Sequence, residues 1–166
     1  MINISGSSGN PVVARLSNFT LRNFTFDGMQ CVSIESVLQS FKFNDGVGLQ
    51  RQICLMSPKK AKEMGTEFPG WKEEQILFWD NHEFNRHGQE YHQLVSRLYD
   101  EVYNQDATFK DDILALGNEE ICHSIGKSDT HDTVLTEQEF MKQLNRLRKQ
   151  ANRNSIVGRP GARILY

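Results

Sequence analysis

The spacing of apolar residues changes period along the chain, and each change predicts a different element. Between residues 24 and 32, two short β-prone runs flank the dipeptide Asp27-Gly28. Such a dipeptide favours the two-residue turn of a β-hairpin, because both of its residues tolerate positive φ angles. The pattern therefore predicts a short hairpin in this part of the chain.

A helical period begins directly after the hairpin. Apolar residues recur at the spacing i, i+3, i+4 and i+7, namely at Ile34, Val37, Leu38 and Phe41. Ser33 precedes them, and its hydroxyl group is suited to cap the first turn. We expect an amphipathic helix over residues 33–43.

Capping signals and helical spacing predict four further helices. They are residues 57–65, between Ser57-Pro58 and Gly65; residues 72–103, with a possible break at Gly88; residues 110–116, ended by Gly117; and residues 136–149, opened by Thr136 with Glu139. Five helical segments and one hairpin indicate a mainly helical α+β domain.

The two ends of the chain differ in composition from the rest. Residues 1–10 hold a Gly/Ser-rich run and are expected to form a flexible leader. Residues 151–166 are irregular in pattern and are expected to form a weakly basic tail. The folded domain is therefore assigned to residues 11–150, a length that supports one hydrophobic core.

Charge and composition narrow the choice of function. The net charge of −2 and the pI near 6.2 argue against a domain that mainly coats nucleic acid or anionic membrane. No run approaches the roughly 20 apolar residues of a membrane span, and the N-terminus lacks a secretory signal. Three widely spaced cysteines suggest reduced thiols. We expect a cytoplasmic protein with no membrane partner.

The sequence predicts no bound metal and no cofactor. A glycine-rich phosphate loop of either common type is missing from it. The histidines His82, His87 and His92 are spaced by five, which would spread them around a helix instead of placing two of them on one face.

Polar side chains in the helix of residues 33–43 form the first candidate site. Glu35, Gln39 and Lys42 fall at i, i+4 and i+7, so a carboxylate, an amide and an ammonium group share one strip beside the apolar stripe. The alternative is an ordinary solvated helix face with a weak Glu/Lys pair.

Two other segments add candidate binding groups. The segment before the hairpin gathers Arg15, Asn18 and Phe19, a mixture of cation, amide and aromatic ring that is typical of small-molecule pockets. In the second segment Trp79 precedes Asp80, so an indole could stack on a planar ring beside a carboxylate. The alternative for Trp79 is an ordinary core or surface tryptophan.

Taken in order, these segments resemble the NADAR or YbiA-like family. The matching pieces are Leu16-Ser17-Asn18-Phe19, Phe26-Asp27-Gly28, the run Ser33 to Phe43, Ala61-Lys62-Glu63-Met64-Gly65, Trp79-Asp80, Leu114-Ala115-Leu116-Gly117 and a closing Leu-rich helix ending at Arg148. The most specific piece follows the pattern Ser-x-Glu-x-x-x-Gln-x-x-Lys-Phe, which residues 33–43 fill at every position.

The resemblance implies a YbiA-like single domain with a short β-hairpin or small sheet, and an N-glycosidase activity. The implied substrate is a phosphorylated ribosyl compound, either a phosphoribosyl-amine intermediate of riboflavin synthesis or an ADP-ribosylated base, which could belong to a nucleic acid. The essential glutamate of the family corresponds to Glu35, and its substrate-stacking tryptophan to Trp79.

The chain departs from the family pattern before the last helix. The family commonly has an Asp followed by Trp-Gly there, whereas residues 123–132 contain no tryptophan. Either Asp129 or Asp132 could fill the acidic position. This departure leaves two alternatives to an enzyme: a module that binds ADP-ribose or a related nucleotide without cleaving it, and a structural protein that retains the fold.

The chemistry of C–N cleavage assigns roles to the candidate residues. Cleavage of a ribosyl C–N bond passes through an oxocarbenium-like state, which a carboxylate such as Glu35 stabilises while it activates water. The helix N-terminus favours the charged form of Glu35, and burial against aromatic rings opposes it. Lys42 could bind phosphate as a point charge and Arg15 as a bidentate fork.

Overall fold

The computed structural model describes residues 1–157 of the chain, with side chains up to residue 154. The elements are β1 (Ile2–Asn3), α1 (Pro11–Arg15), β2 (Phe24–Phe26), β3 (Met29–Cys31), α2 (Ile34–Ser40), α3 (Val47–Cys54), α4 (Pro58–Glu67), α5 (Trp71–Glu74), β4 (Ile76–Trp79), β5 (His82–Asn85), α6 (Gln89–Gln105), α7 (Ala107–Ala115), β6 (Ile121–Cys122) and α8 (Glu137–Val157). The predicted mainly helical α+β class is confirmed, and within the described residues none of the helices is long and apolar enough to cross a membrane.

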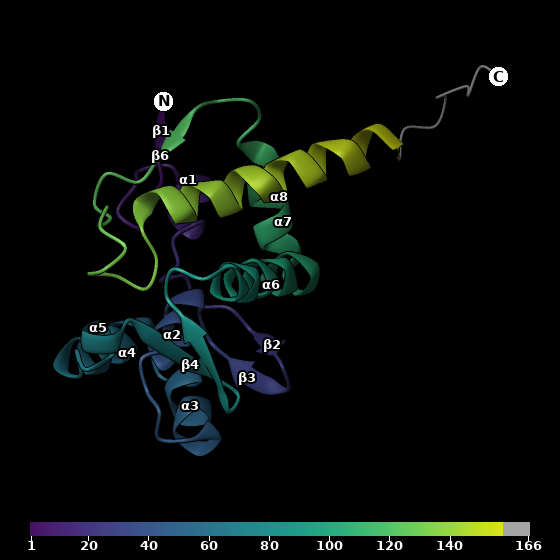
Figure 1. The fold of residues 1–166 in the computed structure, drawn as a ribbon. Coiled ribbons are helices and arrows are strands. Elements are labelled where there is room, and N and C mark those ends of the chain that lie inside the picture. Colours follow the sequence, from purple (N-terminus) through teal and green to yellow (C-terminus); the bar gives the residue numbers. More distant parts are fainter. Residues whose placement is uncertain (158–166) are drawn as a thin grey trace.

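Helices dominate the arrangement, and the strands form three separate two-stranded sheets in the part of the chain described. Figure 1 shows the long helix α8 crossing one end of the molecule above α6 and α7, while α2, α3, α4 and both hairpins form the other end. One large apolar cluster runs through both ends and includes residues of α2, α6 and α8. The two ends therefore share a core.

The hairpin predicted between residues 24 and 32 is confirmed. Strands β2 and β3 pair antiparallel, and Phe26 faces Met29 across the turn. Asp27 and Gly28 both have positive φ angles, 46° and 79°, as a type I′ turn requires. The hairpin leads directly into α2.

The helix after the hairpin begins where the sequence predicts but ends earlier. Ser33 caps it by accepting a hydrogen bond from the N–H of Ser36 at 3.0 Å. The helix ends at Ser40, so Lys42 lies in the turn that follows it. All seven residues of α2 are buried, because α3 and α4 pack on it. A solvated helix face is therefore excluded for Glu35 and Gln39.

The helix predicted over residues 72–103 is wrong in its first half. A short helix α5 is followed by strands β4 and β5, and α6 starts only after Gly88. Asp80 and Asn81 have φ angles of 50° and 63° and form the turn of this second hairpin. Asp and Asn tolerate positive φ angles better than other residues except glycine, so this pair can form the turn. The apolar run before it, Ile76–Trp79, is strand β4.

The predicted stop of a helix at Gly65 is also wrong, since α4 continues to Glu67. Gly65 serves a different purpose. A Cβ atom at this position would lie 1.9 Å from Oε1 of Gln39. Glycine at this position leaves room for the side chains of Gln39 and Lys42, which a Cβ atom would displace.

The two ends of the chain extend the fold beyond the expected boundaries. Residues 1–10 are not a flexible leader, because β1 pairs in parallel with β6 and Ile4 is fully buried. At the other end, α8 passes its predicted end near residue 149 and includes residues 151–157 of the expected tail. The rest of that tail, with Arg159 and Arg163, lies outside the described residues. Helices α1 and α3 were not predicted.

Candidate functional site

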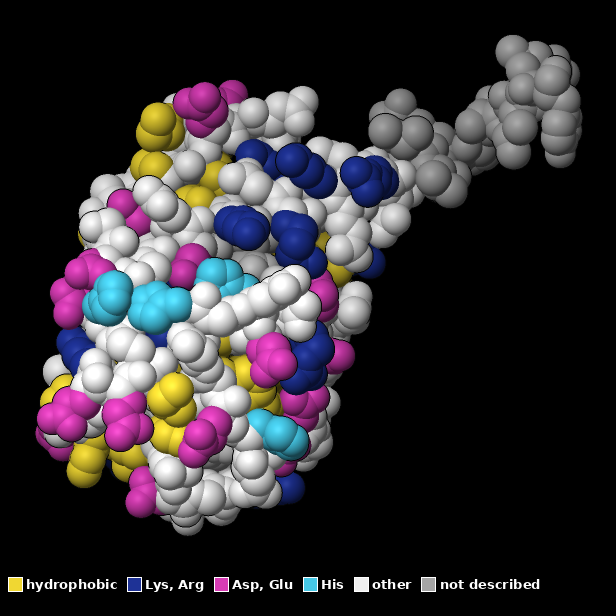
Figure 2. Space-filling model, viewed as in Figure 1, with side chains coloured by type: hydrophobic (Ala, Val, Ile, Leu, Met, Phe, Trp, Pro, Cys, Tyr) yellow, Lys and Arg dark blue, Asp and Glu magenta, His cyan; other side chains and the backbone are white. Residues whose placement is uncertain are grey.

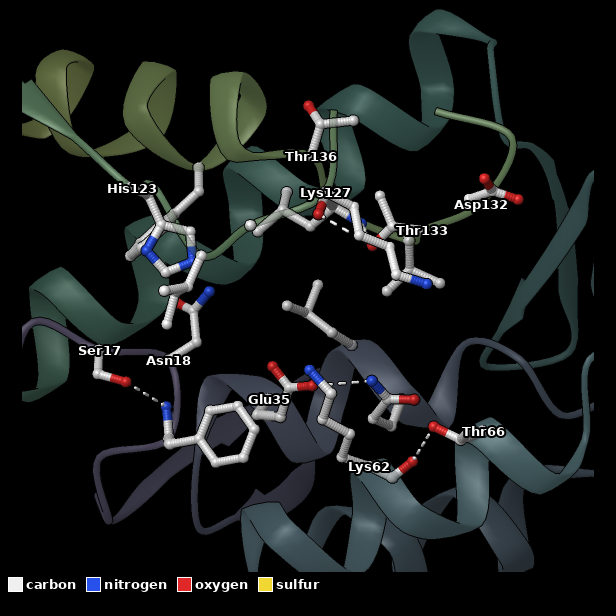
Figure 3. Close-up of a pocket in the computed structure, with 18 of the residues that line it drawn as sticks. Ser17, Asn18, Glu35, Lys62, Thr66, His123, Lys127, Asp132, Thr133 and Thr136 are labelled. Atoms are coloured by element: carbon white, nitrogen blue, oxygen red, sulfur yellow. Dashed lines mark hydrogen bonds between the residues drawn. The ribbon is translucent and has the colours of Figure 1, made fainter. Parts of the chain in front are cut away.

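A cleft of about 250 Å³ lies between α2 and α4 on one side and the segment of residues 123–136 on the other. Figure 3 shows the two walls facing each other, with Glu35 and Lys62 on the helical side and His123, Lys127 and Thr136 on the opposite side. The loop that follows α1 closes one end with Ser17, Asn18 and Phe19. The cleft is lined by residues that are distant in sequence.

Glu35 lies at the floor of the cleft and is 7% exposed. Its backbone N–H donates to the carbonyl oxygen of Asn18 at 3.0 Å, and its Oε1 accepts a hydrogen bond from Nε2 of Gln39 at 2.8 Å. Among the ion pairs within 4.0 Å in the described residues, none involves Glu35. A buried carboxylate with one side-chain hydrogen bond keeps acceptor capacity for a ligand or a water molecule.

Gln39 holds this carboxylate in place, and Asn18 holds the backbone of Glu35. The amide of Gln39 is fixed between Glu35 and Gly65, where its Oε1 is buried without a hydrogen-bond partner in the described structure. The side chain of Asn18 accepts a hydrogen bond from the hydroxyl of Tyr99 at 2.7 Å. Because Tyr99 is fully buried, the loop that carries Asn18 and Phe19 is anchored to α6.

Lysines give the cleft a positive charge. Lys42, Lys62 and Lys127 all line it. Burial lowers the pKa of Lys42 to about 8, the charge of Glu35 opposes this fall, and the ammonium groups of Lys62, Lys72 and Lys127 add to it. Lys62 also lies over the ring of Phe19, with its Nζ 5.4 Å from the ring centroid. Together these ammonium groups would attract an anionic group of a ligand.

The wall opposite Glu35 is held by a buried arginine. Arg86 is fully buried and donates from Nε to the carbonyl oxygen of Thr133 at 2.8 Å. Its two terminal nitrogens bind the carboxylate of Glu139 at 3.0 Å and 2.8 Å. Glu139 also accepts from the N–H of Thr136 at 2.9 Å, which confirms the predicted capping box. Thr133 and Thr136, which both line the cleft, are thereby fixed to α8.

His123 contributes the imidazole of this wall. Its Nδ1 lies 2.7 Å from the carbonyl oxygen of Ile4. A ring nitrogen that faces a carbonyl oxygen must carry hydrogen, so Nε2 is the nitrogen left for other contacts. The N-terminal segment thus orients a cleft residue, a role that its Gly/Ser-rich composition does not indicate.

The structure brings together most of the residues predicted for the site. Five of them line the cleft, namely Asn18, Phe19, Glu35, Gln39 and Lys42. Of the two acidic candidates in the divergent segment, Asp132 lines the cleft, whereas Asp129 does not and bonds to the N–H of His131 at 2.9 Å. Of these two candidates, Asp132 is therefore the one that lies in the cleft.

Two predicted binding residues lie elsewhere. Arg15 points toward α7 and forms a bidentate pair with Asp112, with distances of 2.9 Å and 2.7 Å. Trp79 is 1% exposed, stacks on Phe26 at 5.1 Å and donates from Nε1 to Asp27 at 2.8 Å. Its indole is a core side chain and does not reach the cleft.

Sequence reasoning did not assign Lys62, Lys127 or Thr133 to the site. Lys62 falls inside a segment of the family resemblance, but nothing in its local pattern shows that α4 turns it toward α2. Lys127 and Thr133 lie in a segment without regular structure, so no periodicity predicts their direction. The tertiary fold alone brings them to Glu35.

Comparison with known proteins adds three similarities. Residues 11–149 match the family described as bacteriophage protein GP30.3. A 17.1 kDa uncharacterized protein from the Gp30-rIII intergenic region of Enterobacteria phage T4 is 34% identical over 134 residues, covering 80% of this chain and 88% of that protein. The NMR structure of the E. coli protein YbiA superimposes with a TM-score of 0.65 at 17% identity, over 98% of this chain and 90% of that one. The chain therefore has the YbiA-like fold.

Proposed function

The chain belongs to the family of bacteriophage protein GP30.3 and has the YbiA-like fold, and on the strength of this fold and its cleft we propose that it hydrolyses the N-glycosidic bond of a phosphorylated ribosyl substrate. The substrate is either a phosphoribosyl amine or an ADP-ribosylated base. The observation that carries the proposal is the buried carboxylate of Glu35, which shares one cleft with the ammonium groups of Lys42, Lys62 and Lys127.

Glu35 acts where positive charge develops. As the C–N bond breaks, the nitrogen keeps the bonding electrons and takes up a proton, and the ribosyl carbon becomes oxocarbenium-like. The carboxylate of Glu35 stabilises this cation and accepts a proton from the water whose hydroxyl adds to the carbon. Gln39 keeps the carboxylate oriented through its 2.8 Å hydrogen bond.

The remaining residues of the cleft bind and orient the substrate. The three lysines neutralise the phosphate, each as a point charge. Phe19 is 39% exposed at the end of the cleft, so its ring takes the stacking role that Trp79 cannot fill. His123 is the group on the opposite wall for proton transfer: in its imidazolium form it keeps one proton on Nδ1 against the carbonyl oxygen of Ile4 and gives the other from Nε2 to the leaving nitrogen.

The decisive experiment compares Glu35→Gln with the wild type on both substrate types. Gln39 can still donate to the oxygen of a glutamine, so the variant is expected to fold normally. We expect turnover to fall by roughly 10²- to 10⁴-fold, the range typical of a lost general acid or base, while binding is retained. Products are measured by liquid chromatography with mass spectrometry: free amine and ribose phosphate from the phosphoribosyl amine, and free base and ADP-ribose from the ADP-ribosylated base.

Glu90→Gln provides a matched control, because it makes the same change in the exposed first turn of α6. It should leave turnover unchanged. Full activity of Glu35→Gln would refute the assignment of Glu35. Binding of ADP-ribose by the wild type, with no product from any ribosyl compound, would instead identify a module that binds without cleaving.

A further inference from the structure

The helix α8 has an unusual charge distribution for a chain of net charge −2. From Phe140 to Val157 it contains five Lys and Arg residues and no Asp or Glu. Four of the five fall at i, i+4, i+7 and i+11, which places them on one face of the helix: Lys142, Arg146, Lys149 and Arg153. The positive charge is therefore concentrated along one line.

This line of cations faces away from the core. The opposite face of α8 buries Phe140, Leu144, Leu147 and Ala151. On the outer face, Lys142, Lys149 and Arg153 are exposed. Figure 2 shows the dark blue side chains gathered over α8 in the upper part of the view. Because the apolar face is already occupied, the basic face is available for a partner.

The outer face contains a shallow groove of about 710 Å³, and none of the residues that line it also lines the cleft. Besides the four cations, its lining consists of the amide side chains of Asn145, Gln150 and Asn154, and among the described residues it includes no acidic and no aromatic side chain. Arg146 is held in the groove by Asp100 at 2.6 Å. Lys142, Lys149 and Arg153 form no ion pair within 4.0 Å in the described part of the chain.

We propose that this outer face of α8 docks the phosphate backbone of a nucleic acid strand. The mixture of Lys, Arg, Asn and Gln is the set of side chains that binds nucleic acid phosphates and sugars. A surface that binds a stable protein partner would be expected to offer aromatic side chains as anchors. A surface that binds a membrane would need apolar side chains beside the charges. The outer face of α8 offers neither within the described residues.

The length of this row of cations suits a chain with several phosphates, such as a nucleic acid strand. At a rise of 1.5 Å per residue, the eleven-residue interval from Lys142 to Arg153 spans about 16 Å. A DNA strand carries one phosphate per about 3.4 Å of duplex axis, so several consecutive phosphates fit along this length. The groove is thus built to bind a polyanionic chain, whereas a single phosphate would occupy only a fraction of it.

The test uses the full chain and a fluorescein-labelled single-stranded DNA, with binding followed by fluorescence anisotropy. The triple variant K142Q/K149Q/R153Q removes three exposed charges without touching the core. We expect at least a tenfold loss of affinity. For the wild type, log K should fall against log salt concentration with a slope of about −2 or steeper, because each contact to a single strand contributes about −0.7. The slope should approach zero in the variant.

The matched control is R51Q/K59Q/K60Q, which removes three exposed cations from α3 and α4. It should bind the DNA as the wild type does, and both variants should keep the wild-type unfolding temperature. An equal loss in both variants, or undiminished binding by K142Q/K149Q/R153Q, would overturn the proposal. Tighter binding to phosphatidylserine vesicles than to the DNA would overturn it too, and would assign the face to a membrane surface.

Discussion

Replacement of Lys42 by methionine should make the protein more stable while it impairs the cleft. Burial holds the pKa of this lysine near 8 instead of its ordinary 10.5. At about 1.36 kcal/mol per pKa unit, that fall corresponds to roughly 3 kcal/mol by which folding disfavours the charged amine. The ammonium keeps some contact with water, so we expect Lys42→Met to raise the free energy of unfolding at pH 7 by about 1–3 kcal/mol.

The extra stability of Lys42→Met should depend on pH within a defined range. Below pH 8 the amine is protonated in both the folded and the unfolded chain, and the full cost of burying the charge is present. Between pH 8 and 10.5 the unfolded chain binds more protons than the folded one, so the stability of the wild type rises with pH. The difference between the variant and the wild type should therefore shrink across this window and vanish above it.

Urea denaturation of both proteins at a series of pH values measures this difference directly. Lys60→Met is the control, because Lys60 is exposed on α4 and its replacement should change stability little at any pH. On a phosphorylated substrate, Lys42→Met should lower kcat/KM by about tenfold or more, since a charge-assisted hydrogen bond contributes about 1.5–3 kcal/mol. A variant that is less stable than the wild type, or equally stable at every pH, would refute the reasoning.

Two further predictions test the packing around the site. Gly65→Ala should destabilise the fold by about 1–3 kcal/mol and reduce turnover, because the new methyl group meets Gln39 at 1.9 Å and displaces it from Glu35. Gly70→Ala is the control, since a Cβ atom there has nothing within 4 Å, and it should change neither the free energy of unfolding nor the activity. Trp79→Ala should lower the free energy of unfolding by about 3–5 kcal/mol in urea denaturation, as expected for a large core aromatic. Unchanged stability with lost ligand affinity would show instead that its indole binds the ligand.

The parts of the fold that were predicted correctly depend on neighbouring residues. The first hairpin follows from Asp27-Gly28, because two adjacent residues determine a type I′ turn. The starts of α2 and α8 follow from their capping residues, Ser33 and Thr136. Each hydroxyl accepts a hydrogen bond from the N–H three residues further on. The polar strip of Glu35 and Gln39 follows from the helical period. In each case the physical cause lies within a few positions of the chain.

The errors occur where distant residues decide the outcome. A helix end was predicted at Gly65 because glycine often ends helices. The structure shows that glycine is present because a side chain at this position would collide with Gln39. Arg15 was expected to bind phosphate, but its guanidinium is engaged by Asp112, ninety-seven positions away. The second hairpin was missed because its apolar strand could equally be a buried helical turn when considered alone.

The sequence by itself determined the mainly helical class, the hairpin before α2 and the presence of a carboxylate, an amide and an ammonium group in residues 35–42. Only the tertiary structure decided what these groups face. It buried Trp79 in the core, placed Lys62 and Lys127 beside Lys42, and used Arg86 to fix the opposite wall. The physical reason is that the charge, burial and geometry of a cleft are set by contacts between segments distant in sequence, whereas periodicity and capping report contacts within one segment.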